Sequence, residues 1–148
     1  MSYTVSTIDA CTREEIRELD ALLVELKGSV EEMHTPLCLV VVQRVLAAGH
    51  VLAVMREEHT QKIIGMGTLY VFPTLSGDTG VIKSVIVTRV CRRQGLGRRL
   101  VKFLITEACR LQLNHIDLTS RPSREEAHDL YTSLGFVERD TKVFRLQM

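Results

Sequence analysis

The chain has 148 residues, 45% hydrophobic and 25% charged, a size and composition that suit a globular protein with a sizeable core. The formal net charge of +1 provides no overall attraction to nucleic acid, because the basic character is local to the stretch 89–102. The longest apolar run, 37–42, is far too short to cross a membrane. The N-terminus lacks the apolar core of a secretion signal, so we expect a cytoplasmic protein without a membrane anchor.

No linker, repeat or low-complexity segment interrupts the chain, which predicts a single domain over residues 1–148. The four cysteines show neither a C-x-x-C pair nor a metal-ligand spacing, so we expect reduced thiols and no metal. Cys91 lies among arginines, a setting that can activate a thiol. Because no histidine neighbours it, we interpret Cys91 as a semi-buried loop residue and not as a nucleophile.

The first half of the chain predicts one strand, two helices and a pair of strands. Thr12 and Glu15 have the spacing of a capping box, and apolar residues then recur at helical spacing over 16–26. Gly28 ends this helix and Gly49 ends the next one. The expected segments are strand 3–8, a helix between the cap at Thr12 and Gly28, helix 37–48, and strands 51–56 and 63–71.

The second half alternates strands and helices. Ser123 and Glu126 have the spacing of a second capping box, and Gly135 stands where a helix would end in a positive φ. The expected segments are strand 81–87, an amphipathic helix from Leu96, strand 116–119, a short helix, and a closing hairpin of 137–138 and 142–147. The whole order predicts an α/β fold, a mixed sheet of about six to seven strands flanked by about four helices.

The junction between strand 81–87 and the helix at Leu96 predicts an anion site. The first turn of a helix offers N–H groups without intrahelical acceptors, together with a partial positive charge, so it can hold a diphosphate. Glycine at 95 and 97 removes the Cβ atoms that would keep a phosphate away from the backbone. Positive charge around the same point comes from Arg92, Arg93, Arg98 and Arg99.

Two familiar glycine-loop patterns do not fit this junction. The dinucleotide fingerprint requires a third glycine where Leu100 stands, and a P-loop requires Gly-Lys-Ser/Thr where two arginines follow Gly97. The pattern Arg92-x-x-Gly95-x-Gly97 after Val85-Ile86-Val87 instead resembles the pyrophosphate-binding motif of the GNAT superfamily, the acyl-CoA-dependent N-acetyltransferases. The segment 127–136, which reads A-x-x-L-Y-x-x-L-G-F, is similar to the one that closes many GNAT domains.

The resemblance covers residues 50–148 and implies acetyl-CoA as co-substrate and a primary amine, on a small molecule or a peptide, as acceptor. It implies that the backbone of Val85–Val87 pairs with the pantetheine arm, where a free N–H polarises the thioester carbonyl. Tyr131 matches the tyrosine that many members use as general acid toward the CoA sulfur. The residues that the resemblance assigns to the cofactor are Val85, Ile86, Val87, Arg92, Arg93, Gln94, Gly95, Leu96, Gly97, Arg98 and Arg124.

The sequence departs from the superfamily pattern at the expected general base. Many members carry acidic residues shortly before the pyrophosphate loop, where this chain has Lys83 and Ser84. Lys83 lowers the pKa of the acceptor amine by like-charge repulsion, holds an acidic group of the acceptor, or reaches into solvent. The residues that we expect near the acceptor are Lys83, Ser84 and Arg121. Arg124 stands where many members have an asparagine that contacts CoA. Candidate bases without motif support are His34, Glu31, Glu32, Asp78, His115 and Asp117.

Three functions remain open. The first is an active N-acetyltransferase, and the second is a non-catalytic acyl-CoA-binding module, which the missing acidic residues favour. The third is a nucleic-acid-binding protein, but the arginine loop, residues 89–99, lacks aromatic stacking partners. Lys83, Arg121 and Arg124 indicate an anionic acceptor such as a phosphorylated amino sugar, the substrate type of glucosamine-phosphate acetylases. A homodimer is also compatible with the sequence.

Overall fold

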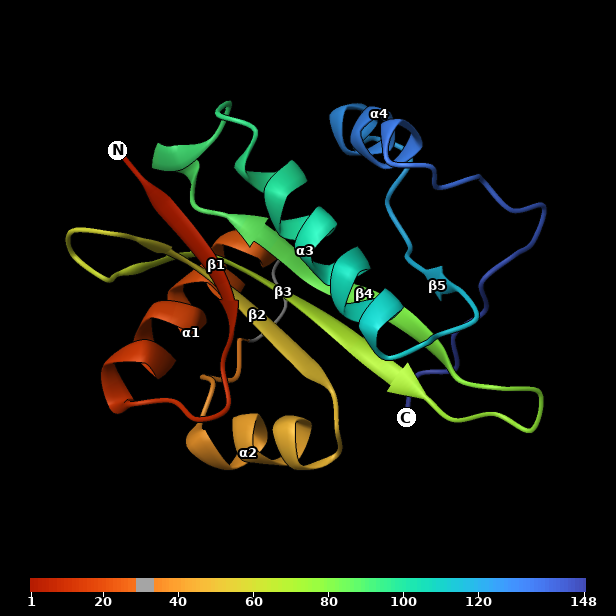
Figure 1. Ribbon diagram of the computed structural model, residues 1–148, viewed down its shortest axis with the longest axis horizontal. Coiled ribbons are helices and arrows are strands. Elements are labelled where there is room, and N and C mark those ends of the chain that lie inside the picture. Colours follow the sequence, from red (N-terminus) through yellow and green to blue (C-terminus); the bar gives the residue numbers. More distant parts are fainter. Residues whose placement is uncertain (29–33) are drawn as a thin grey trace.

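The computed structural model describes residues 1–28 and 34–148, and within them the central element is a mixed sheet of five strands (Figure 1). The strands follow one another across the sheet in chain order, β1 to β5. Neighbouring strands are antiparallel except β4 and β5, which are parallel. The strands are β1 Tyr3–Thr7, β2 Val51–Glu57, β3 Ile63–Phe72, β4 Thr79–Val87 and β5 Ile116–Asp117.

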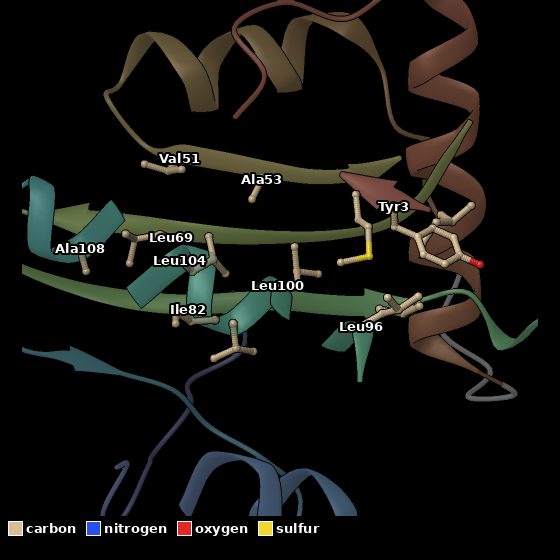
Figure 2. Packing of buried hydrophobic residues seen from close by; sticks show 13 residues of the cluster. Tyr3, Val51, Ala53, Leu69, Ile82, Leu96, Leu100, Leu104 and Ala108 are labelled. Atoms are coloured by element: carbon tan, nitrogen blue, oxygen red, sulfur yellow. The ribbon is translucent and has the colours of Figure 1, made fainter. Parts of the chain in front are cut away.

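Helices cover both faces of the sheet. One face packs against the first two helices through a buried cluster that includes Leu19, Leu22 and Met66. The other face packs against the third helix, and Figure 2 shows Leu100 and Leu104 of that helix beside residues of the strands. None of the described helices is long and apolar enough to cross a membrane. The helices are α1 Arg13–Lys27, α2 Leu39–Ala47, the short 3₁₀ helix η1 Arg89–Cys91, α3 Leu96–Arg110 and α4 Glu125–Ser133.

The predicted cap of α1 and the glycines that end α1 and α2 are confirmed, whereas α2 begins at Leu39, two residues later than predicted. The Thr12 hydroxyl accepts a hydrogen bond from the Glu15 N–H at 3.2 Å, so one otherwise unpaired donor of the first turn of α1 is satisfied. Gly28 follows α1 with φ of 65°. Gly49, two residues after the end of α2, has φ of 84°. Both values lie in the region that glycine adopts with little strain.

The predicted closing hairpin is wrong. Residues 137–138 and 142–147 form no strand in the described part of the chain, and the predicted strand 116–119 is reduced to the two residues of β5. The sheet therefore has five described strands and not six to seven. Val143, Phe144 and Leu146 are 77–88% exposed. Their apolar pattern is compatible with a strand, but the very short β5 offers little backbone for another strand to pair with.

The predicted capping box at Ser123 and Glu126 is also wrong. The Arg124 N–H donates to the Arg121 carbonyl at 3.0 Å, which closes a turn around Pro122. This turn makes Arg124 the N-cap residue and delays the start of α4 to Glu125. Gly135, by contrast, follows the helix with φ of 94°, as predicted.

Candidate active site

The carboxyl half of β4 carries a bulge. Thr68 of β3 lies opposite Lys83, whereas Met66 lies opposite Ile86, so two residues of β4 face one residue of β3. Ser84, the first of these two, has φ of 55°, which is uncommon for a residue other than glycine. The Thr68 hydroxyl donates to the Lys83 carbonyl at 2.7 Å and fixes the backbone just before the bulge.

The same half of β4 has an open edge. β5 pairs only with Gly80 and Val81, at the start of β4. Within the described residues, no strand lies beside 82–87 on that edge. Val85, Ile86 and Val87 therefore stand where an extended group could pair with the strand, as β-strand addition requires.

This open edge leads directly into the predicted anion site. After β4 the chain passes through η1 and enters α3 at Leu96, with Gly95 as the N-cap residue in a left-handed conformation, φ 72° and ψ 13°. A Cβ atom built on Gly95 or on Gly97 would meet no described atom within 4 Å. Gly97 does not have a positive φ, so neither its backbone nor its packing requires glycine. The free space above it fits a group that approaches the helix N-terminus closely.

The four arginines of this region have different surroundings. Arg92 Nε donates to the Val87 carbonyl at 3.0 Å, which joins the loop to the end of β4. Arg99 Nη2 donates to the Tyr3 carbonyl at 2.7 Å, so it is tied to β1 and is less mobile than the sequence suggested. Arg98 Nη1 donates to the hydroxyl of Ser133, at the end of α4. Arg93 is exposed and has φ of 63°.

Tyr131 lies on α4 and is partly buried against the core between the sheet and α3. Its ring meets the ring of Phe136 edge to face, with centroids 5.8 Å apart. Burial raises the pKa of Tyr131 above the usual value of 10, although the positive charge of Arg124 acts in the opposite direction. The phenol is therefore protonated at neutral pH and can donate a proton.

The predicted acceptor residues fall into two groups. Lys83 is exposed and shares a face of the sheet with Thr68 and Tyr70, the face that carries α1 and α2. Arg121 and Arg124 are exposed in the segment between β5 and α4. The Ser120 hydroxyl beside them is buried and has no hydrogen-bond partner among the described residues. No sequence pattern had distinguished Ser120.

Most of the candidate bases that the structure describes lie away from the β4 bulge. Asp78 precedes β4, and Asp117 lies opposite Val81, roughly 13 Å along the strand from Val85. His115 is exposed and lies 3.7 Å from the Asp117 carboxylate. These three residues therefore sit away from the bulge. The other two acidic candidates, Glu31 and Glu32, lie outside the described residues.

His34, the remaining candidate, has an organised environment. Its Nε2 lies 2.8 Å from Asp20 Oδ1, which also accepts the Leu37 N–H at 2.8 Å. Desolvation alone would raise the pKa of Asp20, but the hydrogen bonds from Leu37 and His34 outweigh it and lower the pKa below its usual value. Asp20 was not among the sequence-based candidates, because no local motif links it to a histidine 14 residues away.

A cavity of about 550 Å³ lies elsewhere, where the C-terminal ends of α2 and α3 approach the start of β2. The residues that line it include the polar residues Thr7, Asp9, Gln43 and Arg110. None of the residues predicted for the cofactor or the acceptor lines it. The predicted site is thus an open strand edge beside a helix N-terminus and not this cavity.

Comparisons with known proteins agree with this architecture. The sequence model of the acetyltransferase (GNAT) family matches residues 17–136. No curated protein sequence gives a significant match. The chain is similar to a solved acetyltransferase of Trypanosoma brucei, with 23% identity and a TM-score of 0.81 over 99% of this chain and 100% of that chain.

Two further solved structures share the fold. Glucosamine-6-phosphate N-acetyltransferase of Arabidopsis thaliana is 17% identical, with a TM-score of 0.78 over 99% of each chain. An aminoglycoside acetyltransferase from an uncultured soil metagenomic sample, in complex with sisomicin, is 16% identical, with a TM-score of 0.83 over 99% of this chain and 96% of that chain. With the match over 17–136, this protein belongs to the acetyltransferase (GNAT) family.

Proposed function

We propose that this protein transfers the acetyl group of acetyl-CoA to a primary amine. One observation carries the proposal: the open edge of β4 over 82–87 continues into the helix N-terminus at Gly95 and Gly97, where the space is free. An open strand edge pairs with amide groups, and a helix N-terminus holds phosphate. The pantetheine part of acetyl-CoA is an extended arm with amides, and a diphosphate follows it. The open edge of β4 therefore matches the arm, and the N-terminus of α3 matches the diphosphate.

Different residues of β4, the arginine loop and the segment before α4 would bind different parts of acetyl-CoA. The backbone of Val85, Ile86 and Val87 would pair with the amides of the arm. The loop from Arg92 to Arg98 would wrap the diphosphate, with N–H groups of the first turn of α3 as donors. Arg124, which is exposed ahead of α4, would reach a phosphate from the other side. No described group of three or more His, Cys, Asp or Glu side chains could hold a metal ion.

Acetyl-CoA supplies the thioester, whose carbonyl carbon accepts the amine. The N–H groups at the β4 bulge would stabilise the negative charge that the carbonyl oxygen gains during attack. Tyr131 would donate its proton to the sulfur, because a phenol with a raised pKa is protonated at neutral pH and a thiolate needs a proton to leave as a thiol.

The acceptor would approach from the face of the sheet that carries Lys83 and Ser84, opposite the face covered by α3. Lys83 would hold an anionic group on the acceptor. Two structural neighbours act, by their names, on glucosamine-6-phosphate and on aminoglycosides, and the first of these acceptors is anionic. A phosphorylated amino sugar is therefore one acceptor to include in a panel of small-molecule and peptide amines.

The absence of a carboxylate at positions 83 and 84 supports a second candidate, an acyl-CoA-binding module without catalytic activity. Two measurements separate the candidates. Acetyl-CoA at a hundredfold excess over its Kd should raise Tm by roughly 5–10 °C in both cases. Only the enzyme should release CoA when an amine from the panel is added.

A matched pair of variants locates the binding site. Arg93→Asn removes a positive charge while keeping a side chain that tolerates a positive φ, so it should reduce the Tm shift with acetyl-CoA. Arg139→Asn changes an exposed arginine of the C-terminal segment and should leave that shift unchanged. If acetyl-CoA produces no shift in the wild type while generic DNA binds in a salt-sensitive manner, the arginine loop serves nucleic acid instead.

A further inference from the structure

The orientation of α1 shows which of its flanks faces the acceptor side. Glu18 accepts the Ile63 N–H at 3.1 Å, and Glu25 accepts the Thr88 hydroxyl at 3.0 Å. Ile63 begins β3 and Thr88 follows β4, so this flank of α1 points toward the end of the sheet where the arginine loop lies. Asp20 stands two residues after Glu18, about 200° around the helix. Asp20 therefore projects from the opposite flank, toward the middle of β3 and β4.

The middle of these two strands is where the β4 bulge lies. Thr68, Lys83 and Ser84 occupy it, on or beside the face that carries α1 and α2. The segment before α2 borders the region on the other side, because the Leu37 N–H donates to Asp20. Any group held by Asp20 thus lies between α1 and the segment before α2, on the face of the sheet that carries Lys83.

His34 is that group. A carboxylate oxygen only accepts, so the 2.8 Å contact with Asp20 Oδ1 places the imidazole proton on Nε2 and leaves Nδ1 as the acceptor atom in the neutral ring. The side chains of His34 and Asp20 are only 23% and 26% exposed, which limits their motion. A histidine oriented by a carboxylate is the arrangement by which proteins prepare a general base.

A second contact involves the other ring nitrogen of His34. Lys27 Nζ lies 3.4 Å from His34 Nδ1. Lys27 carries a primary ammonium on a flexible stem, and an acceptor ammonium would displace it in order to donate a proton to Nδ1. The charged groups that contact His34 in the described residues are Asp20 and Lys27, both of α1.

We infer that His34, oriented by Asp20, takes the proton of the acceptor ammonium and so replaces the carboxylate that β4 lacks. The inference rests on the proposed transfer of acetyl groups to amines. His34 Nδ1 takes one proton from the ammonium and passes it to solvent. The nitrogen lone pair forms the new C–N bond, and the electron pair of the broken C–S bond leaves with the sulfur. Tyr131 gives its proton to that sulfur and regains one, through water, from the acylated nitrogen.

The alternative is a purely structural role, in which the Asp20–His34 contact only holds α1 against the segment before α2. Four variants distinguish the two roles. His34→Ala removes the imidazole and leaves space for imidazole added in solution. His34→Gln keeps an N–H donor for Asp20 but cannot take a proton near neutral pH. Asp20→Asn keeps an oxygen for the Leu37 N–H but loses the charge that orients the imidazole. His59→Gln is the matched control, because His59 is an exposed histidine in the turn between β2 and β3.

The measurement is CoA release with the best amine of the panel, as kcat/KM from pH 6 to pH 10, with the Tm shift by acetyl-CoA recorded for every variant. We expect His34→Gln to lower kcat/KM by about 10²- to 10⁴-fold at pH 7, and to leave a rate that rises with pH only as the acceptor amine itself loses its proton. The deficit should shrink at high pH, where the amine loses its proton unaided. Asp20→Asn should lie between wild type and His34→Gln, and imidazole should restore part of the rate of His34→Ala.

The outcomes separate this inference from the proposed function. If His34→Gln keeps the wild-type rate and pH profile while the wild type acetylates amines, the transferase stands and the base is another group. A loss of rate that is uniform in pH and is not rescued by imidazole means that His34 only holds the fold, which also overturns the inference. If the wild type binds acetyl-CoA but acetylates no amine, both proposals fail.

Discussion

Arg98 donates a hydrogen bond to the Ser133 hydroxyl and so joins the first turn of α3 to the end of α4. The two residues are 35 positions apart in the chain. The same hydroxyl donates to the Leu130 carbonyl at 2.7 Å, one turn back along α4. Leu130 directly precedes Tyr131, so the predicted phosphate site and the predicted acid are linked through a single serine.

Ser133→Ala should therefore affect turnover more than binding. Losing one hydrogen bond of about 1 kcal/mol from the support of α4 should lower kcat roughly fivefold, because Tyr131 is then held less firmly. The KM for acetyl-CoA should change less than twofold. Thr132→Ala, at a neighbouring exposed position of α4, is the control and should match the wild type. A rise in KM without a fall in kcat would contradict the link to Tyr131.

Much of the fold could be predicted because its signals are local. The capping residue Thr12, the glycine after α1 and the helical spacing that follows Leu96 each act within a few residues. The closing hairpin failed because a strand needs a partner, and the two residues of β5 provide little backbone for pairing. The Asp20–His34 contact could not be predicted from the sequence either, because only folding brings together residues from α1 and from the segment before α2.

In the arginine loop, too, local features could be predicted from the sequence and long-range contacts could not. Its glycines and arginines could be read directly from the sequence, because a helix N-terminus needs only adjacent residues to hold phosphate. The partners of Arg98 and Arg99 lie on α4 and β1, far away in the chain, so the sequence could not indicate that these two arginines are held in place.

Gly97→Ala should change stability and binding in opposite directions. Alanine favours a helix over glycine by up to about 1 kcal/mol, and the added Cβ meets no described atom within 4 Å, so Tm without ligand should rise slightly. The same Cβ would occupy the space proposed for the diphosphate, so Kd for acetyl-CoA should rise about tenfold or more. Gly49→Ala is the control: its φ of 84° makes alanine destabilising, with no change in Kd. If Gly97→Ala binds acetyl-CoA as tightly as the wild type, the diphosphate lies elsewhere.

Glu57 should contribute to stability at neutral pH and lose that contribution in acid. Hydrogen bonds from the Thr60 hydroxyl and from the N–H groups of His59 and Thr60 lower the pKa of Glu57 to about 2. A carboxylate with a lowered pKa stabilises the fold above the unfolded-state value and loses this effect as pH falls through the folded value. Glu57→Gln should therefore have a lower Tm than wild type at pH 7, with the difference shrinking between about pH 5 and pH 2.

The neighbouring exposed Glu58 provides the comparison for this experiment. Glu58→Gln removes the same charge from the same turn, so it should leave Tm nearly unchanged across the pH range. A difference for Glu57→Gln that stays constant from pH 7 to pH 2 would mean that the glutamine disturbs the turn by its shape and not by its charge.

Tyr131→Phe should slow CoA release while preserving binding and packing. The phenylalanine ring can keep the edge-to-face contact with Phe136, so Tm and Kd for acetyl-CoA should stay close to the wild-type values. Without a proton donor, kcat should fall by about 10²- to 10⁴-fold. Because burial raises the pKa of Tyr131, the wild-type rate should not decline from loss of the acid until the pH exceeds 10.

The same shift predicts an effect on unfolding. A group with a raised folded-state pKa contributes its full stabilisation below its unfolded value, near pH 10, and loses it as pH rises through the folded value. Tm of the wild type should therefore fall more steeply above pH 10 than Tm of Tyr131→Phe, which has no phenol to ionise. Equal slopes for the two proteins, measured together with an unchanged kcat, would remove Tyr131 from the proposed chemistry.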